Sequence, residues 1–125
     1  MILDTNALSA LLMGDQDLKA LISAERELLI PAIVLGEYRF GLLQSRERAR
    51  LESALEQVEA RNTVLAVDRT TARHYAEIRL ALKKLGRPIP ENDIWISALA
   101  KQHARSIVSR DAHFRQVPEL VAVSW

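Results

Sequence analysis

The sequence has no cysteine among its 125 residues, and this absence excludes several kinds of site. A chain without cysteine forms no disulfide, offers no thiolate ligand to zinc and has no cysteine nucleophile. It also lacks an apolar run long enough to cross a lipid bilayer, and its first residues lack the basic-then-apolar layout of a signal peptide. These features are typical of a cytoplasmic protein, and we expect that localisation.

A strong excess of one charge is absent as well. The chain carries 17 lysine and arginine residues against 16 aspartate and glutamate residues, so its formal net charge is only +1. Proteins that bind nucleic acid through a broad basic surface are usually far more positive. If this protein binds a polyanion, we expect local arginines, a metal ion or both to hold it.

The pattern of apolar residues predicts an α/β fold. Hydrophobic residues make up 49% of the chain, which is enough for one ordinary core at this length. Short apolar segments are predicted to be buried strands at residues 1–4, 27–31, 63–67, 106–109 and 120–125. Helical segments separate them. Strands that alternate with helices favour a parallel sheet of about five strands with helices on both faces.

Local signals predict where several helices begin and end. Asp15 and Asp68 are expected N-caps, and Gly86 is expected to end the long helix that Asp68 begins. For the first helix the predicted cap is Thr5 or Asn6. These positions fix the expected helix boundaries.

Acidic residues stand at the ends of two predicted strands and at the start of a predicted buried helix. Asp4 directly follows the first strand, and Ser109 and Asp111 follow the fourth. Asp93 leads a helix within residues 88–100 that is apolar all round, which is typical of a buried helix. In open α/β sheets, ligands bind beyond the carboxyl ends of the strands.

Glu37 is a further acid in an unusual setting. Its helical neighbours include Val34 and Phe40, which are residues of the core type, and Gly36 and Gly41 flank it. A glycine inside a helix costs about 1 kcal/mol against alanine. We therefore expect close backbone packing around Glu37.

Each acid taken alone has a structural explanation. Asp93 suits the first turn of a helix because of the helix dipole. Asp4 and Asp111 suit helix capping, and Glu37 suits an ion pair with a nearby arginine. Taken together, clustered carboxylates repel one another strongly where water is scarce. A site made of carboxylate oxygens suits Mg²⁺ or Mn²⁺, and such ions activate water to attack a phosphodiester.

Four segments of the chain resemble, in order, the four motifs of PIN-domain ribonucleases. They are "ILDTNAL", "VLGEYRFG", "ENDIWISALA" and "SRDAHF". The most similar members are the small bacterial VapC-type toxins of toxin–antitoxin pairs. The resemblance covers essentially the whole chain, including the final "VAVSW", and so predicts a single PIN domain over residues 1–125.

The resemblance implies a metal-dependent endoribonuclease with a parallel sheet between helices. Its catalytic acids correspond to Asp4, Glu37, Asp93 and Asp111. Asp4, Asp93 and Asp111 would hold one or two Mg²⁺ ions, with Mn²⁺ as an alternative, and Glu37 would orient or deprotonate the attacking water. Supporting hydroxyls are expected at Thr5 and Ser109.

The resemblance also implies partners. We expect Arg39 and Arg110, which lie near motif acids, to contact substrate phosphates. Single-stranded or loop RNA is the expected substrate, because unpaired segments can enter a narrow cleft. A protein antitoxin is expected to cover apolar surface of the first helices and to insert an arginine or lysine among the acids. Homodimer formation is a further expectation from the family.

Two other interpretations stay open at this point. A receiver domain of a response regulator also uses acids and Mg²⁺, but it needs an acidic pair after the first strand and a lysine after the last full strand, and neither is present. A catalytically silent PIN domain that only binds a partner is the second. The histidines show no paired metal-ligand spacing, and the "AHF" setting of His113 predicts packing or capping.

Overall fold

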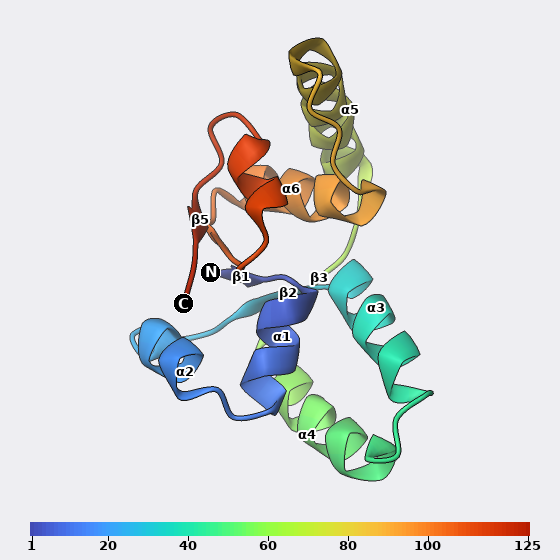
Figure 1. The fold of residues 1–125 in the computed structure, drawn as a ribbon, viewed down its shortest axis with the longest axis vertical. Coiled ribbons are helices and arrows are strands. Elements are labelled where there is room, and N and C mark those ends of the chain that lie inside the picture. The colour runs from blue at the N-terminus through green and yellow to red at the C-terminus, as the bar shows by residue number, and fades with distance from the viewer.

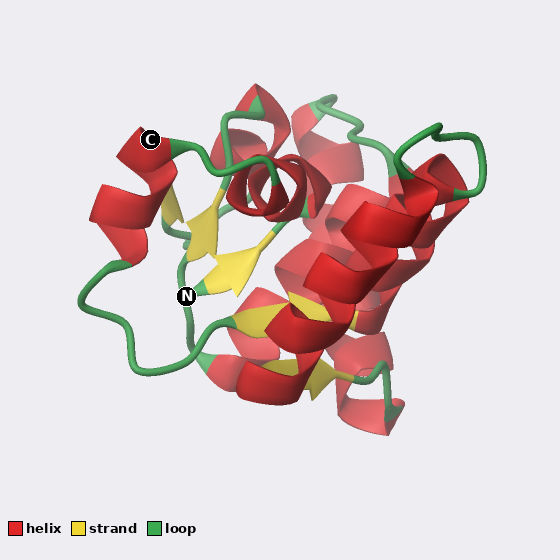
Figure 2. Ribbon diagram, turned by 90° about the horizontal axis from the view of Figure 1, so that it is seen from below, coloured by secondary structure: helices red, strands yellow, loops and turns green.

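The structure is a computed structural model that describes residues 1–125, and it shows a five-stranded parallel sheet among helices (Figures 1 and 2). The strands are β1 (Ile2–Leu3), β2 (Leu29–Pro31), β3 (Thr63–Leu65), β4 (Ile107–Val108) and β5 (Ala122–Val123). All neighbouring strands pair in parallel, in the order β3-β2-β1-β4-β5. The predicted α/β class, with five parallel strands, is confirmed.

Six α-helices and one short 3₁₀ helix connect the strands. They are α1 (Thr5–Leu12), α2 (Gln16–Ile22), α3 (Ala32–Leu42), α4 (Arg48–Arg61), α5 (Arg69–Leu85), α6 (Glu91–His103) and the 3₁₀ helix η1 (Ala112–Gln116). None of these helices combines the length and the apolar character that crossing a membrane requires.

Helices cover both faces of the sheet. Successive residues of a strand point to opposite faces. Ile2 of β1 accordingly belongs to a core cluster with Leu99 of α6, whereas Leu3 belongs to a second cluster with Leu18 of α2. In Figure 1, α5 and α6 lie on one side of the strands, and α1 and α2 lie on the other.

The strand order places the first and fourth strands side by side in the middle of the sheet. The chain builds the sheet from β1 through β2 to β3 and then returns to the other side of β1 with β4. Leu3 pairs with Val108, so the residues that follow them, Asp4 and Ser109, meet at the carboxyl edge. Such a switch point is where open α/β sheets bind ligands.

Most of the predicted helix ends are confirmed. The Asp15 carboxylate accepts a hydrogen bond from the Leu18 N–H at 3.0 Å, and Asp68 forms a capping box with Thr71. Gly86 ends α5 in the left-handed conformation, with φ of 64°. These capping hydrogen bonds can be predicted without tertiary information, because each joins a residue to the first or last turn of its own helix.

The predicted cap of the first helix is wrong. Asp4 is the N-cap of α1, and its Oδ1 atom accepts a hydrogen bond from the Ala7 N–H at 2.8 Å. Helix α1 therefore begins at Thr5, with only Asp4 between it and β1. The strand ends one residue before the helix, so the same aspartate serves the helix and the edge of the sheet.

The prediction of close packing at Gly36 and Gly41 is also wrong. A Cβ atom at either position would meet no atom within 4 Å. Phe40, expected in the core, is 67% exposed. The buried side of α3 follows the helical repeat through Val34, Tyr38 and Leu42.

Two glycine-to-alanine variants test the left-handed conformation of Gly86 and the open surroundings of Gly36. We expect Gly86→Ala to lower the free energy of unfolding by about 1 kcal/mol, because alanine is strained at positive φ. Gly36→Ala removes a helix-interior glycine without a clash, so we expect a gain of about 0.5–1 kcal/mol. Urea denaturation followed by circular dichroism measures both. Destabilisation by Gly36→Ala would contradict the open surroundings of this residue.

Candidate active site

Acidic side chains from four separate segments come together at the carboxyl edge of the sheet. Asp4 follows β1, Glu37 lies on α3, Asp93 lies in the first turn of α6, and Asp111 lies between β4 and η1. Glu37 and Asp111 are both close enough for their negative charge to raise the pKa of Asp4 and of Asp93. The four acids therefore form one electrostatic unit.

Asp4 and Ser109 form the buried side of this unit. Asp4 is only 4% exposed and Ser109 only 3% exposed. The Ser109 hydroxyl donates a hydrogen bond to Oδ2 of Asp4 and accepts one from the Asp111 N–H at 2.8 Å. One hydroxyl thus ties the end of β1 to the loop that presents Asp111.

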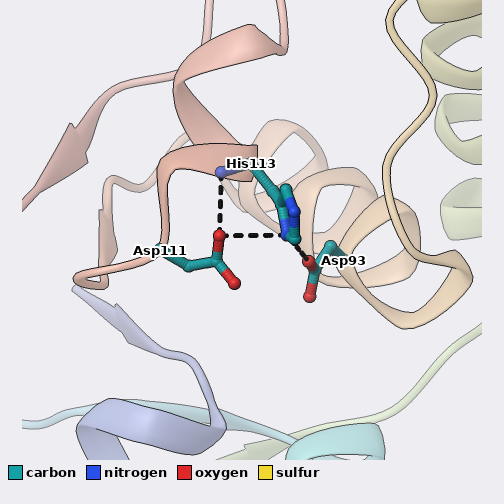
Figure 3. A group of neighbouring side chains, drawn as sticks. All are labelled: Asp93, Asp111 and His113. Atoms are coloured by element: carbon teal, nitrogen blue, oxygen red, sulfur yellow. Dashed lines mark hydrogen bonds and ion pairs between the residues drawn. The ribbon is translucent and has the colours of Figure 1, made fainter.

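His113 joins two of the acids. Its Nδ1 atom lies 3.0 Å from Oδ2 of Asp93 and 2.9 Å from Oδ1 of Asp111, as Figure 3 shows. Ionised carboxylates only accept hydrogen bonds, so the proton on this side of the ring sits on Nδ1 when both acids are charged. The imidazole then offsets part of the repulsion between the two carboxylates.

The interpretation of His113 as a packing or capping residue missed this contact. Its backbone N–H does take part in a cap, because it donates to Oδ1 of Asp111 at 2.9 Å. The ring, however, reaches Asp93, which lies 20 positions away in the sequence. The only available signal was the closeness of His113 to Asp111 in the chain, and spacing alone does not reveal the third partner.

Burial sets the electrostatics of the site. Burial raises the pKa of Asp4 above its ordinary value, while the hydrogen bonds from Ser109 and Ala7 partly oppose this rise. Burial likewise raises the pKa of Asp93, and the hydrogen bond from His113 opposes it. Folding therefore holds these carboxylates where their charged forms are disfavoured.

The donor chemistry of the site fits a divalent cation. Ligand atoms of Asp93, Asp111 and His113 all lie within 4.8 Å of one another. The Thr5 hydroxyl, next to Asp4, is buried without a hydrogen-bond partner, although buried hydroxyls nearly always have one. A hydrated cation offers positive charge to the carboxylates and water to polar groups nearby. The cluster is consistent with a metal site.

A groove of about 320 Å³ adjoins the acids. Its lining includes Thr5 and Glu37 together with Met13 and Tyr38. The groove therefore continues from residues next to the site to the end of α1, where Met13 is 64% exposed. The groove has a mixed polar and apolar lining and lies beside a negatively charged centre.

The two arginines expected to bind phosphate are engaged elsewhere in the structure. Arg39 donates a hydrogen bond to the Glu59 carboxylate at 2.7 Å. Arg110 donates from Nε to the carbonyl oxygen of Trp125 at 3.0 Å. Their contacts with a substrate stay a prediction.

Comparison with known proteins identifies the family to which this chain belongs. The PIN domain family matches residues 1–120. Ribonuclease VapC5 of Mycobacterium tuberculosis is 34% identical over 116 residues, covering 90% of this chain and 84% of that protein. The crystal structure of VapBC-5 from the same organism, a member of the VapBC family of toxin-antitoxin systems, has a TM-score of 0.76 at 29% identity and covers 98% of this chain and 94% of that chain.

A further crystal structure supports the fold. VapBC2 of Rickettsia felis, bound to a DNA fragment from its promoter, has a TM-score of 0.88 at 22% identity and covers 99% of this chain and 97% of that chain. The chain therefore belongs to the PIN-domain family. Within that family it is similar to the VapC ribonucleases, as its motifs indicated. This membership removes the receiver-domain alternative.

The raised pKa of Asp93 makes stability depend on pH. A carboxyl whose pKa is higher in the folded protein favours folding when it is protonated, and this contribution is lost as pH rises through the folded pKa. In EDTA we therefore expect Asp93→Asn to gain stability relative to the unsubstituted protein as pH rises from about 3 to 7. Thermal melting across this range measures the difference.

The matched control is Glu56→Gln, which removes an exposed acid of α4. Its melting temperature should follow the unsubstituted protein across the same range. A difference for Asp93→Asn that does not change with pH would contradict the assigned burial of this carboxylate.

Proposed function

We propose that this chain is a metal-dependent endoribonuclease that hydrolyses RNA phosphodiester bonds as a single PIN domain over residues 1–125. It acts in the cytoplasm as the toxin of a toxin–antitoxin pair. The convergence of four carboxylates from distant segments at a strand switch point carries this proposal. The similarity to VapC5, a ribonuclease, supports the choice of RNA as substrate.

The acids have distinct roles in this proposal. Asp4, Asp93 and Asp111 would hold Mg²⁺ or Mn²⁺, directly or through water. The His113 ring lies beside Asp93 and Asp111 and would donate a hydrogen bond to these carboxylates from Nδ1. A bound divalent cation neutralises the acids, polarises the scissile phosphate and lowers the pKa of water. Both carboxylate oxygens of Asp4 accept protein hydrogen bonds and keep lone pairs for this purpose.

The remaining polar groups orient the reactants. Glu37, on α3, is close enough to act electrostatically on Asp4 and Asp93, and it would orient or deprotonate the attacking water. Ser109 fixes the Asp4 carboxylate and the backbone of Asp111 at the same time. The Thr5 hydroxyl is buried beside Asp4 and has no hydrogen-bond partner in the protein. Single-stranded or loop RNA suits the recessed position of these groups.

Cleavage assays test this function directly. We expect the purified protein to cut RNA with Mg²⁺ or Mn²⁺ and to stop in EDTA. Asp93→Asn should fold normally and lose at least about 100-fold in activity, since even changes to the outer partners of metal ligands cost about 10–100-fold. A labelled RNA oligonucleotide reports the rate. The control Asp17→Asn, at an exposed acid of α2, should leave activity unchanged.

Either of two results would contradict the proposed function. Undiminished cleavage in EDTA would exclude the metal mechanism. Complete inactivity of the unsubstituted protein, with its fold intact, would favour the catalytically silent alternative.

Exposed apolar side chains provide surface for the proposed protein partners. An antitoxin segment lies along the groove between α1 and α3, which Met13 lines. Phe40 and Leu43, of α3 and its C-terminal end, are further exposed apolar residues. The antitoxin segment places an arginine or lysine among the acids and displaces metal, and arginine grips carboxylates best because its contacts are bidentate. We also propose a homodimer, for which further apolar surface lies at Val64, Val67, Leu80 and Leu85.

Growth experiments test the toxin role. We expect expression of this chain alone to slow bacterial growth, because an unregulated ribonuclease degrades the RNA of its host. Co-expression with the adjacent gene should restore growth. Asp93→Asn, expressed to the same level, should be harmless because it lacks one charge of the metal site. Equal toxicity of this variant and the unsubstituted protein would show that toxicity arises elsewhere.

A further inference from the structure

A contact set next to the site has no part in the mechanism above. It consists of Arg110, Trp125 and Asp15, and is called the Arg110 anchor here. We propose that Arg110, held by Trp125 and Asp15, is a positioning residue that fixes Ser109 and Asp111 for metal binding. This inference rests on the proposed function and assigns a role to residues outside the acidic cluster.

The guanidinium of Arg110 makes three contacts, two with Trp125 and one with Asp15. Its Nε atom donates a hydrogen bond to the Trp125 carbonyl oxygen at 3.0 Å. Its central carbon lies 4.4 Å from the centroid of the Trp125 ring, which is a cation–π distance. Its Nη2 atom lies 3.9 Å from Oδ2 of Asp15, and the Trp125 indole N–H donates to that same oxygen at 3.2 Å.

The partners of Arg110 are themselves fixed. Trp125 packs against the core cluster that contains Leu3 and Leu18. The other carboxylate oxygen of Asp15 caps α2 through the Leu18 N–H at 3.0 Å. Figure 1 shows the end of the chain between β5 and α2. The anchor therefore joins the loop after β4 to an element on one face of the sheet.

Arg110 lies between two residues of the site in the sequence, so contacts that hold Arg110 also hold its neighbours. On one side of Arg110 in the sequence is Ser109, whose hydroxyl donates a hydrogen bond to Asp4. On the other side is Asp111, whose carboxylate contacts His113. Strand β4 is only two residues long, and the ladder to β5 ends where the Ser109 N–H donates to the Val123 carbonyl at 2.9 Å. Beyond that bond the loop needs side-chain contacts to stay in place, and small displacements of metal ligands are costly.

The anchor and a direct RNA contact make different demands on Arg110. A direct phosphate contact involves only the Arg110 side chain, so Arg110→Lys would weaken RNA binding, whereas Trp125→Leu would not. The anchor requires the Nε hydrogen bond and the flat guanidinium on the indole ring, which lysine cannot supply. An isolated surface ion pair such as Arg110 with Asp15 contributes little by itself.

The test compares Arg110→Lys, Trp125→Leu and the double variant. Isothermal titration calorimetry measures Mn²⁺ affinity without RNA, and steady-state kinetics measures kcat and KM on an RNA oligonucleotide. We expect each single variant to weaken Mn²⁺ binding about 10-fold and to lower kcat at subsaturating Mn²⁺, with KM for RNA nearly unchanged. The double variant should be no weaker than either single variant, because both remove one coupled unit.

Two controls separate this role from general damage. Trp125→Phe keeps a ring beneath the guanidinium and should bind Mn²⁺ more tightly than Trp125→Leu. Arg115→Lys changes an exposed arginine of η1 outside the anchor and should match the unsubstituted protein. Melting curves confirm that every variant is folded at the assay temperature.

The outcomes are distinct. Unchanged Mn²⁺ affinity in Arg110→Lys and Trp125→Leu overturns the anchor while leaving the proposed ribonuclease intact. A raised KM for RNA in Arg110→Lys, with normal Mn²⁺ affinity, assigns Arg110 to phosphate binding instead. An unsubstituted protein that neither binds Mn²⁺ nor cuts RNA overturns the proposed function, and the anchor with it.

Discussion

Repulsion among carboxylates at the shared edge of β1 and β4 is the constraint on which the rest of the structure depends. Parallel pairing of these strands brings Asp4 beside Ser109, and α6 and η1 add Asp93 and Asp111. Burial raises the pKa of Asp4 and Asp93, and the neighbouring acids raise it further. The fold tolerates this arrangement because hydrogen-bond donors surround the acids, and the donor set suits a cation.

The donors that stabilise the acids also build the local structure. Asp4 caps α1, and Asp111 caps η1, while both face the same cluster. Structural and functional explanations of these residues are therefore compatible. An aspartate at the start of a helix is oriented by the helix backbone, so its second oxygen is presented to the site in a fixed direction.

His113 and Arg110 show two ways in which the chain manages charge around Asp111. The imidazole of His113 lies between Asp93 and Asp111 and places a donor where a cation would also bind. Arg110 is the neighbour of Asp111 in sequence, yet its guanidinium is held by Trp125. The positive charge nearest to Asp111 in the sequence therefore contacts Trp125 and Asp15.

The sequence by itself determined the α/β class, the five strands, most helix caps and the identity of the clustered acids. The strands and caps depend on periodicity and on contacts within one helix turn, and both are visible in a short window of residues. The acids were predicted from their places at strand and helix ends and from the resemblance to the PIN-domain motifs. The tertiary structure alone decided the exposure of Phe40, the open surroundings of Gly36 and the participation of His113. It also decided the contact between Asp4 and Ser109, which are 105 positions apart, and that between Asp15 and Trp125, which are 110 positions apart. Contacts of this kind depend on the order of the strands and on helix orientation, and these are set by the packing of the whole core.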